Sequence, residues 1–317
     1  MSLKFGVHYT GPNQAKEVAD FAARSQALGF DSVWFREGAL GGDPLAPLAV
    51  AAAACELLVG TAVLVMPFRN PVLTARTVAS LDELSGGRLV LGVGVGGERQ
   101  REFDAYGIAA KERGPRTNEA LALMLRLWQE SEVTFEGRFF KAEKATLGVR
   151  PAQQPHPPIW VGGRLGGQGR SRDAALRRLA RFGDGWLPYL VTPEQYETGL
   201  ERLAGYAAER GRDASAFTKA LQINVALYPS RDEALGVIMD GSARGYGLNR
   251  DQVERYYAFG TPAEAGARLA EYAAAGVEHF VFQWGCRRED IVANLDALAE
   301  EVLPALRDVA AADVKAP

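Results

Sequence analysis

The chain has 317 residues, 47% of them hydrophobic and 24% charged, and its net charge of −3 excludes the broad basic field that favours nucleic acid. The longest apolar run, residues 45–55, contains Pro47 and is too short to cross a bilayer. Cys55 and Cys286 lie far apart and residues 1–6 begin a strand, so we expect a cytoplasmic protein without a disulfide framework, signal peptide or membrane attachment.

Eight segments have the alternation or the short apolar run that is typical of buried strands. They are residues 4–9, 31–35, 57–65, 88–95, 159–163, 185–189, 219–228 and 277–283. Segments with helical spacing of apolar residues, several opened by capping signals at Asp43, Thr192 and Thr261, lie between them. These helices are predicted over residues 14–28, 43–56, 72–84, 119–129, 173–182, 192–210, 232–240, 250–259, 261–276 and 288–306.

One region breaks this alternation. Residues 133–140 are typical of a hairpin that turns at Glu136-Gly137, and a proline-rich run follows over residues 150–158. We interpret residues 131–158 as an insertion between the fourth and fifth strands. Residues 241–247 are expected to form a flexible join between two helices.

Strands that alternate with helices imply parallel strands with right-handed crossovers. Eight such units predict an α/β fold, a TIM (β/α)8 barrel, formed by residues 1–317 as a single domain. The alternative is an open doubly wound sheet. The count of eight favours closure, and so does the absence of a Gly-x-Gly-x-x-Gly turn after the first strand.

The fourth strand runs into a glycine-rich end, Gly92-Val-Gly-Val-Gly-Gly97, followed by a charged segment over residues 98–110. Glycine at a strand end permits close approach of another group to the backbone, or a bend. We therefore expect this stretch to form the wall of a ligand pocket. The alternative is a strand corner with a solvated loop.

In a barrel the site lies at the C-terminal ends of the strands. There His8, Glu37 and Glu98 are candidate acids or bases, and the alternative for each is a polar lining residue without a catalytic role. The three histidines are scattered, so no metal site is expected. The glycine-rich segment Gly162 to Arg170 is the candidate phosphate loop, or else a flexible surface loop. Because obvious catalysts are few, we expect a cofactor that brings its own chemistry.

The sequence resembles the luciferase-like monooxygenase family along essentially its whole length, and most of all the branch that uses the deazaflavin coenzyme F420. The stretches that carry the resemblance occur in the family's order. They are residues 4–8, 29–34, 60–64, 70–71, 81–82, 85–94, 102–107, 113–114, 135–137, 155–163 and 183–186.

The resemblance implies a homodimeric barrel with a cofactor across its C-terminal mouth and a small-molecule substrate. It places Ala62 and Val63 against the ring system, joined by a non-prolyl cis peptide bond. It places Val95 and Gly96 in the same cavity. The cofactor tail is expected at Gly162 and Gly163, beside Leu187, Pro188 and Tyr189, so Gly163→Val is expected to weaken cofactor binding and leave the fold intact.

The sequence departs from the F420-using pattern at the end of the second strand. There an acidic residue followed by histidine is usual, and this chain has Glu37-Gly38. Without that imidazole we expect Glu37 and Gly38 to shape the cofactor pocket. We expect His8 to be the proton donor, because its unperturbed pKa is near neutrality.

Four functions follow as hypotheses. The first is F420-dependent hydride transfer to or from a small organic substrate. The alternatives are an FMN-dependent monooxygenase, a cofactor-binding protein without turnover, and an unrelated barrel isomerase or lyase. The resemblance argues strongly against the last of these.

Overall fold

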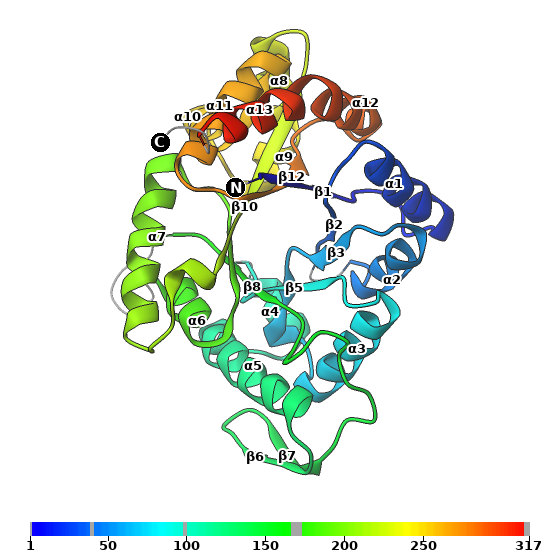
Figure 1. Cartoon of the computed structure of the whole chain (residues 1–317), viewed down its shortest axis with the longest axis vertical. Coiled ribbons are helices and arrows are strands. Elements are labelled where there is room, and N and C mark those ends of the chain that lie inside the picture. The colour runs from blue at the N-terminus through cyan, green and yellow to red at the C-terminus, as the bar shows by residue number, and fades with distance from the viewer. Residues whose placement is uncertain (1, 39–40, 98–99, 166–172, 314–317) are drawn as a thin grey trace.

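The computed structural model describes residues 2–38, 41–97, 100–165 and 173–313, in which parallel strands close into a barrel surrounded by helices (Figure 1). Closure comes from pairing of the last barrel strand with the first, as in Val7 beside Phe282. The barrel strands are β1 (Lys4–His8), β2 (Ser32–Phe35), β3 (Leu58–Thr61), β5 (Leu89–Gly94), β8 (Ile159–Gly163), β9 (Gly185–Pro188), β10 (Thr218–Leu227) and β12 (His279–Trp284). The predicted (β/α)8 barrel is confirmed, and the open doubly wound sheet is excluded.

Helices cover the outside of the barrel. Thr192 and Thr261 form the predicted capping boxes with Gln195 and Glu264. At the start of α2, Asp43 lies one residue before the N-cap position, Pro44, and accepts from the N–H of Leu45 at 3.0 Å. The main helices are α1 (Ala15–Ala27), α2 (Leu45–Ala54), α3 (Pro71–Leu84), α5 (Arg113–Gln129), α6 (Ala174–Phe182), α7 (Pro193–Ala208), α8 (Arg231–Asp240), α11 (Pro262–Ala274), α12 (Ile291–Ala297) and α13 (Leu303–Asp313).

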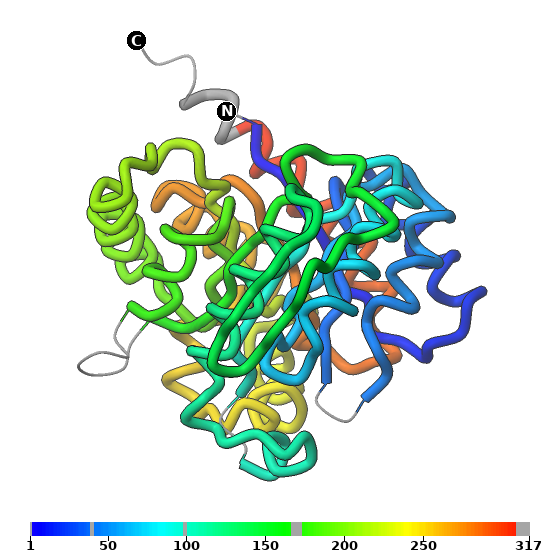
Figure 2. The backbone as a smooth tube through the Cα atoms, turned by 90° about the horizontal axis from the view of Figure 1, so that it is seen from below, coloured from blue at the N-terminus to red at the C-terminus, as the bar shows by residue number. Residues whose placement is uncertain are grey.

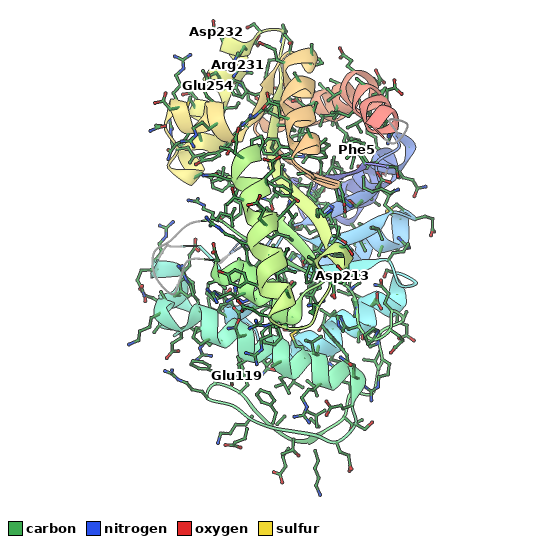
Figure 3. All side chains as sticks on the ribbon, turned by 60° about the vertical axis from the view of Figure 1, so that its left-hand side comes forward. Phe5, Glu119, Asp213, Arg231, Asp232 and Glu254 are labelled. Atoms are coloured by element: carbon green, nitrogen blue, oxygen red, sulfur yellow. The ribbon has the colours of Figure 1, made fainter. Side chains whose placement is uncertain are left out.

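The predicted insertion contains an antiparallel hairpin of β6 (Val133–Glu136) and β7 (Lys141–Ala145), which lies outside α5 (Figure 1). Glu119 of α5, labelled in Figure 3, holds it in place. The carboxylate accepts from the backbone N–H groups of Phe139 and Phe140, both at 2.7 Å. A Cβ at Gly137 would lie 2.1 Å from the same carboxylate, so a side chain there would displace it. The hairpin is therefore docked on α5, outside the barrel.

At four places the short elements differ from the predictions. The charged segment after β5 contains a helix, α4 (Gln100–Ala105), and the predicted flexible join contains α9 (Ser242–Tyr246). The helix predicted to reach residue 259 ends earlier as α10 (Arg250–Tyr256), because the chain then pairs with β10 as β11 (Ala258–Gly260). The third barrel strand is interrupted and resumes as β4 (Leu64–Val65). In Figure 2 the cyan segment around α4 and the yellow segment around α8–α10 project on one side of the barrel.

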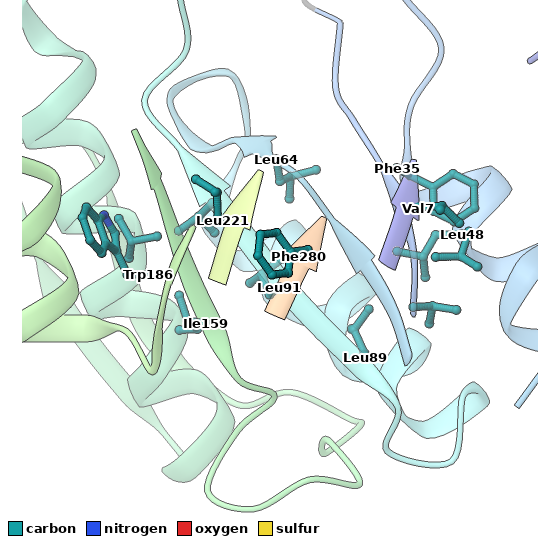
Figure 4. Packing of buried hydrophobic residues seen from close by; sticks show 14 of the residues in the cluster. Val7, Phe35, Leu48, Leu64, Leu89, Leu91, Ile159, Trp186, Leu221 and Phe280 are labelled. Atoms are coloured by element: carbon teal, nitrogen blue, oxygen red, sulfur yellow. The ribbon is translucent and has the colours of Figure 1, made fainter. Parts of the chain in front are cut away.

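Buried apolar side chains form two layers, because successive residues of a strand point to opposite faces. The outer layer packs the strands against the helices, and Figure 4 shows part of it, including Val7, Leu91 and Phe280. The inner layer is small and fills the barrel axis. It consists of Trp34, Ala62, Val90, Trp160, Leu187, Ala220 and Val281, with Val63 against it. Within the described residues, no helix is both long enough and apolar enough to span a membrane.

Candidate functional site at the barrel mouth

The interruption of the third strand brings Ala62 and Val63 to the C-terminal mouth. The bond between them is a non-prolyl cis peptide, as predicted. The N–H of Ala62 donates to Phe35 O at 2.8 Å, and Val63 O accepts from the N–H of Glu37 at 3.3 Å. Ala62 is 4% exposed and belongs to the inner layer. A small apolar wall therefore lies at the edge of the mouth, and its backbone is tied to the end of β2.

The glycines of β5 permit the expected close approach to the backbone, and the group that approaches is the neighbouring strand. A Cβ at Gly92 would lie 1.8 Å from Thr61 O, and a Cβ at Gly94 would lie 2.6 Å from Val63 Cγ2. On the neighbouring β8, a Cβ at Gly162 would lie 2.8 Å from Val63 Cγ1. The neighbouring strand thus occupies the space beside these glycines. Their function is to admit the interrupted strand, which in turn forms the wall of the site.

The Glu37 carboxylate forms hydrogen bonds with other residues of the chain. Its carboxylate accepts from Arg69 Nε at 2.9 Å and from the N–H of Val65, and its side chain is 7% exposed. These bonds occupy both oxygens, since Arg69 takes Oε1 and Val65 takes Oε2. We therefore treat Glu37 as a residue that positions the backbone around Val63 and Val65. Its contact with a cofactor and its catalytic role stay predictions.

Gly38 is exposed, and among the described residues a Cβ there would meet the backbone of Gly41 alone, at 3.8 Å. A side chain could therefore be accommodated at Gly38, where the F420-using pattern has histidine. Val95 and Gly96 follow β5 at the mouth, where a Cβ at Gly96 would lie 3.0 Å from Val65 Cγ1. The third candidate acid, Glu98, lies outside the described residues.

The described residues include part of the site predicted for the cofactor tail. Gly162 pairs with Leu187 and Gly163 with Pro188, so the ends of β8 and β9 meet, with Tyr189 next along the chain. The Arg164 guanidinium lies 5.3 Å from the centre of the Tyr189 ring. Residues 166–170, the rest of the predicted phosphate loop, lie outside the described part of the chain.

The expected effect of Gly163→Val needs correction. Gly163 has φ +152°, and a Cβ there would lie 3.0 Å from Ala175 Cβ. A valine would therefore strain the fold even without a cofactor. A side chain that is not packed into the barrel, such as Arg164, is a better probe of this end of the site.

His8 lies at the end of β1, on the face that points to the barrel axis, and its side chain is fully buried. Neither ring nitrogen has a hydrogen-bond partner within the described residues. Burial, reinforced by the charge of Arg36, lowers the pKa of His8 to about 3, while the side chain of Gln222 acts in the opposite direction. His8 is therefore uncharged at neutral pH. This corrects the expectation that a near-neutral pKa makes it a proton donor.

Beside His8 lies a group of polar side chains that the sequence analysis did not bring together. Gln222 on β10 donates through Nε2 to Gln283 Oε1 on β12, and Tyr246 of α9 donates to the same oxygen at 3.2 Å. Burial raises the pKa of Tyr246, so its hydroxyl stays protonated. Asn224, two residues beyond Gln222, is 3% exposed and its Oδ1 has no partner among the described residues.

The opposite end of the barrel provides a contrast within the same fold. His279 begins β12, and its Nε2 lies 2.8 Å from Ser32 Oγ, which also accepts from Trp34 Nε1. Burial lowers the pKa of His279 to about 4. That imidazole has a partner and lies away from the mouth. Within the described residues, no cluster of His, Cys, Asp or Glu could hold a metal ion.

Comparison with known proteins places this geometry in a family. Residues 2–245 match the profile of the luciferase-like monooxygenases. The F420-dependent glucose-6-phosphate dehydrogenase of Intrasporangium calvum is 30% identical to this chain, and the alignment covers 92% of this chain and 95% of the relative. A phthiodiolone/phenolphthiodiolone dimycocerosates ketoreductase of Mycobacterium tuberculosis is 32% identical over 67% of this chain and 49% of its own.

Solved structures agree on the fold. An F420-dependent secondary alcohol dehydrogenase bound to an F420–acetone adduct has a TM-score of 0.81 at 21% identity, over 96% of this chain and 99% of its own. The monooxygenase RslO1 of Streptomyces bottropensis has a TM-score of 0.79 at 26% identity, over the same shares. The protein described here belongs to the luciferase-like monooxygenase family.

Proposed function

We propose that this protein is an oxidoreductase that uses coenzyme F420 to transfer hydride to or from a small organic substrate. The observation that carries the proposal is the composition of the mouth. It combines a small apolar wall at Ala62 and Val63 with one buried, uncharged imidazole, His8. Such a site has little chemistry of its own and suits a bound redox cofactor. The F420-dependent relatives, which align over nearly the whole chain, favour F420 as that cofactor.

The residues present fit a cofactor that joins a planar ring to an anionic tail. Ala62 and Val63, with Val95 and Gly96, would hold the ring. The backbone of Gly162 and Gly163 would hold the tail, beside Leu187, Pro188 and Tyr189. Arg164, which is exposed, and Arg36 supply positive charge near this mouth. When bound, F420 accepts or supplies the hydride.

The chain's own residues would position the substrate. His8 is uncharged and buried, so it would accept a hydrogen bond from a substrate hydroxyl. Glu37 would hold the wall through Arg69. Glu98 stays a candidate acid or base, and Gly38 leaves room beside the pocket.

An FMN-dependent monooxygenase is the second candidate. It is favoured by the similarity to monooxygenase RslO1 over 96% of the chain. A protein that binds a cofactor without turnover is the third candidate, because Gly38 replaces the usual histidine.

Binding and turnover separate these candidates. We expect the purified protein to quench F420 fluorescence on titration, and to bind FMN at least tenfold more weakly. Tight FMN binding without F420 binding would overturn the proposal. F420 binding without absorbance change across a panel of alcohols, ketones and sugar phosphates would support the non-catalytic alternative.

We further propose that residues 1–317 form one domain, and that the protein is a cytoplasmic homodimer that binds no nucleic acid. These expectations come from the family resemblance, from the cysteine content and from the net charge of −3. Light scattering coupled to gel filtration would test the dimer: a mass near 34.2 kDa, that of one chain, would exclude it.

A further inference from the structure

Arg36 lies at the end of β2, on the face of the strand that points to the barrel axis. Trp34, two residues earlier, belongs to the inner layer, and strand alternation places Arg36 on the same face, one step nearer the mouth. The residues on either side of Arg36 are hydrogen-bonded to the wall at Ala62 and Val63. The backbone of Arg36 is therefore fixed beside the wall that would hold the cofactor ring, and the residue is exposed.

The charge of Arg36 has no counter-charge in the described part of the chain. Its guanidinium forms no hydrogen bond or ion pair there, and the carboxylate of the adjacent Glu37 is bonded to Arg69. Burial, and after it the charge of Arg36, lowers the pKa of His8, so that this imidazole is neutral and brings no second charge. A guanidinium with free donors is suited to a carboxylate or phosphate, which it can bind through two parallel N–H bonds. A bound anion would therefore supply the missing partner.

Two buried polar side chains at the same mouth have atoms without partners among the described residues. His8 lies on β1, in register with Trp34 of β2, and both of its ring nitrogens are unpartnered. Asn224 on β10 is 3% exposed, and its Oδ1 is unpartnered as well. A neutral imidazole has one lone-pair nitrogen and an amide has a carbonyl oxygen, so both residues can accept a hydrogen bond. Buried acceptors of this kind indicate a ligand that carries hydroxyl groups.

The order of strands separates Arg36 from the site predicted for the cofactor tail. Three barrel strands lie between β2 and β9 in either direction around the barrel. The tail is expected at the ends of β8 and β9, where the Arg164 guanidinium lies 5.3 Å from the centre of the Tyr189 ring. Arg164 is thus the cation on the tail side. Arg36, across the mouth and beside the strand of His8, is left for the other reactant.

We propose that Arg36 binds the anionic group of the substrate, a carboxylate or a phosphate, and that His8 and Asn224 accept hydrogen bonds from hydroxyls of the same molecule. The substrate class is then a small hydroxylated acid or phosphate ester. The identity of this ligand as a substrate rests on the proposed function, whereas the anion site is a property of the protein without cofactor.

Calorimetric titration of the protein without cofactor, at constant ionic strength, tests the anion site. The probes form matched pairs that differ in charge: lactate with propane-1,2-diol, and glycerol 3-phosphate with glycerol. We expect the anionic member of at least one pair to bind at least tenfold more tightly than the neutral one, and that pair identifies the anion. The preference should fall below twofold in Arg36→Met and be partly kept in Arg36→Lys, which retains the charge without the planar fork. Arg76→Met removes an exposed arginine of α3 and is the control for net charge.

Cofactor titration and kinetics separate the two arginines. Arg164→Met should weaken F420 binding at least fivefold, whereas Arg36→Met should change it less than twofold. With F420 bound, KM for the anionic alcohol should rise at least tenfold in Arg36→Met and less in Arg36→Lys. Absence of a preference for the anion in the wild type, or an unchanged preference in Arg36→Met, would overturn the inference. Weakened F420 binding in Arg36→Met would also overturn it, because Arg36 would then hold the cofactor. An anion preference that depends on Arg36, in a protein that binds no F420, would support the anion site and refute the proposed function instead.

Discussion

The barrel mouth has two halves that are built differently. In the glycine half, formed by β3, β5 and β8, backbone and small side chains interlock, and a Cβ at Gly92 or Gly94 would collide with the neighbouring strand. In the polar half, formed by β10, β12 and β1, long polar side chains converge, and atoms of His8 and Asn224 have no partner in the part of the chain that the structure describes. Steric constraint therefore fixes the shape of one half. The other half keeps polar groups that a ligand can satisfy.

The largest decrease in the free energy of unfolding should come from a substitution in the glycine half. Gly92→Ala would place Cβ 1.8 Å from Thr61 O, a backbone atom that cannot rotate away. We expect the free energy of unfolding to fall by about 3 kcal/mol, as for severe overpacking. Urea denaturation measures this, and Gly148→Ala is the control, because a Cβ there meets nothing within 4 Å. A fully stable Gly92→Ala would show that the interlock is not required.

The next largest decrease in the free energy of unfolding should follow from breaking the ion pair of Glu37 with Arg69, which supports the glycine half. Glu37→Gln keeps an acceptor for the N–H of Val65 but removes the carboxylate that pairs with Arg69, which is 15% exposed. Among the described acidic residues Arg69 then keeps the longer contact to Asp43 at 3.1 Å. We expect a loss of about 2–3 kcal/mol, as for a buried hydrogen bond to a charged group. Asp20→Asn, which breaks an exposed pair with Lys16, should cost less than about 0.5 kcal/mol. Unchanged stability with weakened F420 binding would make Glu37 a ligand contact instead.

A pH titration examines the polar half directly. The pKa of His8 is about 3 in the folded protein, against 6.5 for the unperturbed group, so the unfolded state binds more protons in between. The contribution to stability is complete above pH 6.5 and is lost as the pH falls toward 3. At pH 5 the loss from His8 amounts to about 2 kcal/mol, at 1.36 kcal/mol per pH unit.

His279, with a pKa of about 4, adds a comparable loss at pH 5. His8→Gln and His279→Gln should therefore each flatten the fall in the free energy of unfolding between pH 7 and pH 5. If His8→Gln leaves the slope unchanged, His8 is more solvated than its burial indicates.

The two halves also differ in how far the sequence predicts them. The glycine half follows from local spacing: Gly92, Gly94 and Gly162 stand out within one strand or strand end, and the family resemblance predicted the cis peptide at Ala62-Val63. The sequence predicted that another group approaches these glycines closely or that the chain bends, and it left open which group approaches. In the structure the neighbouring strand fills that space, and this pairing of β3 with β5 cannot be deduced from local spacing.

The polar half has no such local signature. Gln222 and Gln283 lie in strands of ordinary composition, 61 residues apart, and only barrel closure brings them together. Tyr246 belongs to a segment that was predicted to be a flexible join. Alternation along β10 could have indicated that Gln222 and Asn224 share the inward face with Ala220. The buried state of His8, and hence its lowered pKa, needed the covering elements to be placed.

The smallest effect on stability, and the sharpest contrast between structural and functional residues, should come from two buried asparagines. Asn224 and Asn294 are both 3% exposed. Asn294 Oδ1 accepts from the N–H of Leu227 at 2.6 Å, and its amide donates to Asp290 O, whereas Asn224 Oδ1 has no partner within the described chain.

Removal of an amide that is hydrogen-bonded leaves its partners without hydrogen bonds, which costs stability. Removal of a buried amide oxygen that has no partner relieves a desolvation penalty. We therefore expect Asn294→Leu to cost about 2 kcal/mol, and Asn224→Leu to change the free energy of unfolding by less than about 1 kcal/mol, toward greater stability. The same Asn224→Leu protein should lose turnover or substrate binding at least tenfold, because Asn224 lies beside Gln283 at the mouth and its Oδ1 is left for a ligand. Denaturation curves and steady-state kinetics on the two variants test this pair. If Asn224→Leu destabilises the protein as much as Asn294→Leu and leaves the kinetics unchanged, the polar half is a structural network and the assignment of the two halves is wrong.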